Sequence, residues 1–69
     1  MSKFKIEIAS VPDRENLVAE IWYNEILVAE INQETAKLEI EFYLNEKIIF
    51  GLDDFFETLE TAKRKIIKE

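Results

Sequence analysis

Four stretches of this chain alternate apolar and polar residues with a period of two. They lie at about residues 3–9, 17–23, 27–32 and 37–44, and Ile, Leu, Ala and Phe supply most of the apolar set. Successive side chains of a β-strand point to opposite faces, so this period is typical of strands with one buried face. The intervals between the stretches are too short for helices. The pattern therefore predicts an antiparallel meander.

The registers of the predicted strands agree on one apolar face. Ile8 is expected opposite Leu17, and Ile31 opposite Leu38. Between them, a three-residue loop at residues 24–26 sets Ile21 opposite Ala29, whereas a two-residue loop would mix the two faces. Because each register brings apolar residues together, the predictions for neighbouring strands support one another.

The last third of the chain changes period. After a turn at residues 45–46, a short fifth strand is expected at residues 47–50, with Ile49 opposite Phe42, and Gly51 ends it. Asp54 and Glu57 have the spacing of a capping box, which predicts a helix at about residues 54–67. The apolar stripe of this helix is Phe55, Phe56, Leu59, Ala62, Ile66 and Ile67.

The sequence thus predicts an α+β fold in a single domain, residues 1–69. An antiparallel meander of four strands, or five with the short one, carries one C-terminal helix across its apolar face. A chain of 69 residues has a marginal core, and without cysteines it must rely on packing or on association with another copy.

The chain contains neither histidine nor cysteine. Histidine is the usual general base and metal ligand, and thiolate is the main alternative nucleophile. Paired carboxylates can act as acid and base in glycosidases, but they need a cleft that separates their pKa values. We therefore expect no enzyme, no cofactor and no metal site, and we interpret Asp53 and Asp54 as helix-capping residues.

The net charge is −6. Proteins that bind duplex DNA or membrane surfaces usually carry a basic surplus, so direct nucleic-acid or membrane binding is not expected. The N-terminal residues have no continuous apolar segment like that of a signal peptide, and no run is long enough to span a membrane. The default expectation is a cytoplasmic protein.

The sheet face away from the predicted helix holds the candidate binding residues. Four glutamates crowd together there, with like charges on facing strands, which is destabilising unless a cation relieves it. A tryptophan between two valines adds an apolar spot with an acidic rim, as in interface hot spots. The face is either a solvated surface or a docking surface, and the tryptophan either contacts a partner or covers the sheet. The candidates are Val18, Glu20, Trp22, Val28, Glu30, Glu39, Glu41 and Tyr43.

These features favour a small non-catalytic protein-interaction module that uses the open sheet face. A homodimer is expected, because a marginal core gains from association, and a basic protein is the second expected partner. The alternative is an acidic inhibitor, such as an immunity, antitoxin or phage-encoded protein, that blocks a basic nucleic-acid enzyme by imitating phosphate charge.

Three segments resemble a group of small uncharacterised bacterial proteins. They are Leu17-Val18-Ala19-Glu20-Ile21-Trp22-Tyr23, Val28-Ala29-Glu30-Ile31-Asn32-Gln33-Glu34, and the predicted helix from Asp54 to Lys65. The resemblance implies a short hairpin-rich sheet closed by a C-terminal helix, in a bacterial or phage setting. It implies no activity and no site residues.

Overall fold

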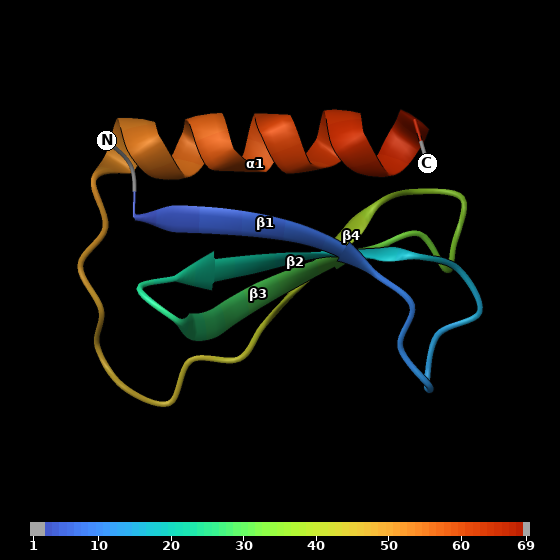
Figure 1. Cartoon of the computed structure of the whole chain (residues 1–69), viewed down its shortest axis with the longest axis horizontal. Coiled ribbons are helices and arrows are strands. Elements are labelled where there is room, and N and C mark those ends of the chain that lie inside the picture. The colour runs from blue at the N-terminus through green and yellow to red at the C-terminus, as the bar shows by residue number, and fades with distance from the viewer. Residues whose placement is uncertain (1–2, 69) are drawn as a thin grey trace.

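The computed structural model describes residues 3–68 and has an α+β architecture (Figure 1). The strands are β1 (Phe4–Ala9), β2 (Val18–Tyr23), β3 (Ile26–Asn32) and β4 (Glu39–Phe42), and the helix is α1 (Leu52–Lys68). The strands form one antiparallel sheet in the order β1-β2-β3-β4. The predicted four-stranded meander with a C-terminal helix is confirmed.

Helix α1 lies on one side of the sheet and contacts mainly β1 and β2 (Figure 1). The buried core lies between these elements and consists of Ala19, Ile21, Val28, Ala29, Ile31, Ala62 and Ile66. A helix is about 10 Å wide, whereas the outer strands of a four-stranded sheet lie about 14 Å apart. One helix therefore cannot cover the whole face, and the β4 side stays open.

Two of the predicted registers are displaced by two residues. Ile8 pairs with Ala19 instead of Leu17, and Ile31 pairs with Ile40 instead of Leu38. A shift of two keeps each side chain on its predicted face, because the side-chain period of a strand is also two. Period alone therefore predicts the faces but not the partners.

The turn between β2 and β3 has two residues, Asn24 and Glu25, so the predicted three-residue loop is wrong. Both residues have positive φ, 52° and 71°, as the tight turns of β-hairpins require. The expected pairing of Ile21 with Ala29 is nevertheless present. A bulge reconciles the two observations: Trp22 pairs with Leu27, so Val28 is the extra residue of β3.

The segment after β4 forms no strand, so the predicted fifth strand at residues 47–50 is wrong. This segment runs around the end of the sheet to reach α1 (Figure 1). Phe50 leaves the plane of the sheet and packs against three rings, with centroid distances of 5.0 Å to Phe4, 4.7 Å to Tyr23 and 5.3 Å to Phe55. The aromatic cluster anchors the connection, and β4 remains an edge strand.

The helix begins at Leu52, two residues before the predicted start. The Phe55 N–H donates to the carbonyl of Gly51 at 3.0 Å, which closes the first turn. Asp54 therefore lies within the first turn and is not the N-cap, so the predicted capping box is wrong. Asp53 and Asp54 instead place negative charge near the positive end of the helix dipole.

Candidate functional site

An arginine outside the predicted site organises the sheet face away from α1. The Arg14 Nε donates to Glu30 Oε2 at 3.0 Å, and its Nη2 donates to Glu41 Oε1 at 2.7 Å. The Tyr43 hydroxyl lies 3.1 Å from both Glu30 Oε1 and Glu41 Oε1. We call these four residues the Arg14 cluster. Glu30 faces Glu20 on one side and Glu41 on the other, so Arg14 supplies the cation that the crowded glutamates require.

The loop between β1 and β2 holds Arg14 in place. It drops to the sheet side opposite α1 (Figure 1), and the Arg14 N–H donates to the carbonyl of Val11 at 3.2 Å. The Glu34 carboxylate, from the loop after β3, accepts the backbone N–H groups of Glu15 and Asn16, each at 3.1 Å. The two loops are thereby tied together, and these contacts hold the guanidinium toward Glu30 and Glu41.

The electrostatics of the Arg14 cluster follow from its geometry. Desolvation, followed by hydrogen bonding to the carboxylates of Glu41 and Glu30, raises the pKa of Tyr43 to about 12. The hydrogen bond to Glu30 is the main reason that the pKa of Arg14 is also raised. Tyr43 therefore stays neutral and Arg14 stays charged at physiological pH.

Two residues of the predicted apolar spot are not accessible. Val18 and Val28 are both 0% exposed. Val18 begins β2 beside the loop that carries Arg14, and Val28 is the bulged residue and belongs to the buried core. The expectation that they lie exposed around Trp22 is wrong, because the period-two pattern could not reveal a loop folded over the face or a bulge.

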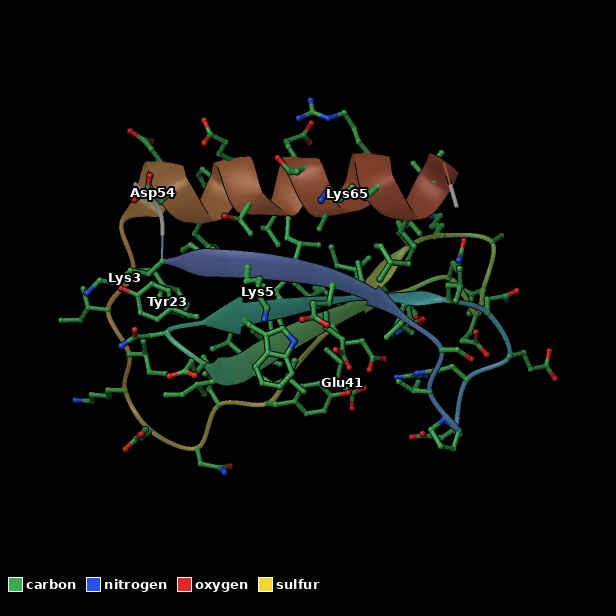
Figure 2. All side chains as sticks on the ribbon, in the orientation of Figure 1. Lys3, Lys5, Tyr23, Glu41, Asp54 and Lys65 are labelled. Atoms are coloured by element: carbon green, nitrogen blue, oxygen red, sulfur yellow. The ribbon has the colours of Figure 1, made fainter. Side chains whose placement is uncertain are left out.

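Trp22 is half-buried, and its indole N–H donates to Glu20 Oε1 at 3.2 Å. It lines a hollow of about 480 Å³ together with Lys3, Lys5 and Glu7 of the β1 side and the Asn24-Glu25 turn. Lys5 pairs with Glu7 at 3.0 Å. Figure 2 shows Lys5 and Glu41 on the same side of the sheet, away from α1. The face thus carries Lys3, Lys5 and Glu7 along β1 and is acidic toward β4.

Among the four glutamates predicted to crowd this face, the accessible ones lie on β4. Glu30 is 5% exposed, whereas the Glu41 side chain is 51% exposed and Glu39 is exposed as well. Tyr43, just after the strand, is 39% exposed. Of the eight candidates, the structure leaves Glu39, Glu41 and Tyr43 open to a partner, with Glu20 and Trp22 half-buried beside them.

The helix side of β4 is also open, which the sequence did not predict. Ile40 and Phe42 were expected beneath the helix, but they are 40% and 54% exposed. A hollow of about 300 Å³ lies between β4 and α1, lined by Ile31, Leu38, Glu39, Ile40, Leu59, Glu60 and Lys63. We call it the β4–α1 hollow. Strand count and helix width together could have indicated it, since one helix covers only part of four strands.

Among residues 3–68, no three potential metal-ligating side chains are grouped as a metal site would require. In the same range, no helix has the length and apolar character needed to cross a membrane. Comparisons with protein-family models, curated proteins and solved structures found no match to the chain.

Proposed function

We propose that this protein is a small non-catalytic interaction module that binds a basic protein segment at the acidic side of its open sheet face. The observation that carries the proposal is the uneven charge of that face. Arg14 bonds to both the buried Glu30 and the exposed Glu41, so a single cation is shared by two carboxylates, and Glu39 is exposed on the same edge strand. Exposed carboxylates next to apolar side chains attract a cationic partner and steer its approach.

The alternative function, inhibition of a basic nucleic-acid enzyme by charge mimicry, stays a prediction. Mimicry of a phosphate backbone needs several free carboxylates in succession. Arg14 engages two of the four glutamates predicted to form the acidic face, and Trp22 donates to a third, Glu20. A local docking site therefore has more support than an extended anionic surface.

The proposal is tested by titrating the isotope-labelled protein with a disordered peptide of Lys, Gly and Ser, which offers charge without apolar contacts. We expect amide shifts centred on Glu39, Glu41 and Tyr43, and binding that weakens as salt rises to about 0.15 M. The variant Glu39→Gln should bind the peptide more weakly.

Glu57→Gln is the matched control, because Glu57 is also exposed but lines a separate hollow between α1 and β1. It should bind the peptide like the natural sequence. Shifts spread evenly over all the acidic residues, or equal losses in the two variants, would overturn the proposal.

A further inference from the structure

We infer that the edge of β4 and the β4–α1 hollow together accept an extended partner segment in which Lys or Arg alternates with apolar residues, and that this segment adds to the sheet as a fifth strand. The inference rests on the proposed function and specifies the conformation and chemistry of the partner. Three observations carry it: the backbone of the edge, the two faces of β4, and its charge.

The backbone groups of β4 that point away from the sheet can be assigned. The Tyr43 N–H donates to the carbonyl of Val28 at 2.9 Å, so at this position the backbone faces β3. Hydrogen-bonding direction alternates along a strand. The N–H and C=O groups of Ile40 and Phe42 therefore face outward, where the sheet has no further strand among the described residues. An added strand would pair with these groups, as in β-augmentation.

The two faces of β4 differ in the way that an alternating partner requires. On the helix side, Ile40 and Phe42 are exposed beside the β4–α1 hollow, and the Phe42 ring lies 6.5 Å from that of Phe55 of α1. On the other side, Glu39 and Glu41 are exposed. Alternate residues of an added strand would face an apolar surface and an acidic surface in turn.

The charge of β4 distinguishes a basic partner from a second copy of the chain. Antiparallel pairing of two β4 strands about a two-fold axis keeps residues of like face opposite each other. Ile40 then faces either Ile40 or Phe42 of the other copy, and in both registers glutamate faces glutamate. Like charges directly opposite are destabilising, and charged residues on edge strands oppose self-pairing. Lysine or arginine opposite Glu39 and Glu41 would instead be favourable.

The test compares a peptide of strictly alternating Lys and Val with a block-sequence peptide of identical composition. We expect the alternating peptide to bind roughly tenfold more tightly, a free-energy difference near 1.4 kcal/mol. N-methylation at every second residue of the alternating peptide tests the backbone hydrogen bonds to β4, because it removes the N–H donors along one edge of the bound peptide. Methylation of the residues whose N–H groups point toward β4 should abolish binding. Methylation of the intervening residues, whose N–H groups point away from β4, should leave binding unchanged.

Variants of the protein locate the contact. Ile40→Thr retains β-propensity but removes part of the apolar surface beside the hollow, and it should weaken binding of the alternating peptide severalfold. Ile49→Thr is the control, since Ile49 is 91% exposed and lies in the connection after β4. Circular dichroism should show both variants folded.

The outcomes separate this inference from the proposed function. Equal binding of alternating and block peptides, or equal loss with either methylation pattern, would overturn strand addition while leaving acidic docking intact. Failure of every basic peptide to bind would overturn both. A dimer that persists and excludes the peptides would assign the β4 edge to a second copy and would also overturn the inference.

Discussion

At the scale of single residues, Arg14 supplies a positive charge to glutamates that the sequence alone shows only as crowded negative charges. From the sequence, Glu30 is an uncompensated charge between other glutamates. In the structure its side chain is 7% exposed and bonded to the Arg14 guanidinium and the Tyr43 hydroxyl. Removing one member of a buried, hydrogen-bonded group usually lowers the free energy of unfolding by more than the whole group contributes to it. The reason is that the remaining buried charges and polar atoms are left without partners.

Glu30→Gln should therefore destabilise the protein, whereas the crowding of like charges predicted from the sequence alone would make removal of this charge stabilising. The amide retains an acceptor but loses the charge opposite Arg14, so we expect a loss of roughly 1–3 kcal/mol in the free energy of unfolding. Urea denaturation measures it. Glu39→Gln, an exposed neighbour on β4, should change stability little. A gain with Glu30→Gln would show that the Arg14 contacts do not stabilise the fold.

Glu34 should contribute to acid sensitivity. Backbone N–H donors of Glu15 and Asn16 lower its pKa in the folded state, so its stabilising effect is present above the unfolded-state pKa and is lost as pH falls through the lower, folded value. Thermal melts between about pH 5 and pH 3 should show a smaller decline in melting temperature for Glu34→Gln than for the natural sequence. Identical slopes would mean that the loop contacts do not persist in solution.

At the scale of elements, the β2–β3 hairpin satisfies two requirements that conflict. The tight turn pairs Tyr23 with Ile26, whereas the apolar face requires Ile21 opposite Ala29. The bulge at Val28 adds one residue to β3, so that both pairings are present. Its cost is local, whereas misalignment of the faces would extend along both strands.

A substitution in the turn between β2 and β3 should raise the stability of the protein. Glu25 has φ of 71°, a left-handed conformation that costs a residue with a Cβ roughly 1–2 kcal/mol, against about 0.4–1 kcal/mol for the added chain entropy of glycine. Glu25→Gly should therefore raise stability by roughly 0.5–1 kcal/mol. In the connection after β4, Glu46→Gly should only destabilise. Chemical denaturation of both variants measures the change in the free energy of unfolding. A lower stability of Glu25→Gly would argue against the two-residue turn.

Helix α1 should depend most on its buried residues. Ile66 is 1% exposed, whereas Leu59 is half-buried and borders the β4–α1 hollow. Ile66→Ala should cost roughly 2–5 kcal/mol. Leu59→Ala should cost clearly less, although Leu59 belongs to the apolar stripe predicted from the sequence. Equal losses in thermal unfolding would indicate that α1 covers β4 more closely in solution.

At the scale of the whole molecule, the marginal size and the exposed apolar residues beside β4 still favour self-association, and the charge of −6 opposes it. Val18 and Val28 do not contribute to such an interface, because they are buried. We propose a weak dimer through Ile40 and Phe42, which a basic partner would displace.

Such a dimer should strengthen with salt, because salt screens the repulsion between glutamates on the two copies. Light scattering at high concentration should show a mass rising above 8.2 kDa as salt increases, and Ile40→Thr should reduce the effect. Ile49→Thr serves again as the control. Binding of a basic peptide has the opposite salt dependence, so the two associations can be told apart. A mass that stays at the monomer value under all conditions would exclude the dimer.

The sequence by itself determined the class of every main element and the faces of the strands, except at the bulge of β3. Alternation such as Phe4, Ile6 and Ile8 reports which side of a strand is buried, and the stripe through Ala62 and Ile66 reports the buried side of the helix. These properties depend on neighbours along the chain, so a local pattern contains them.

Only the tertiary structure decided which residues meet. The pairing of Ile31 with Ile40, the burial of Val18 and Val28, and the contact of Arg14 with Glu30 and Glu41 all join residues distant in sequence. A shift of two residues along a strand leaves the hydrophobic pattern unchanged, so alternation cannot select among such registers. The open edge of β4 arises in the same way, because the width of one helix and the route of the connection to it are properties of three-dimensional packing.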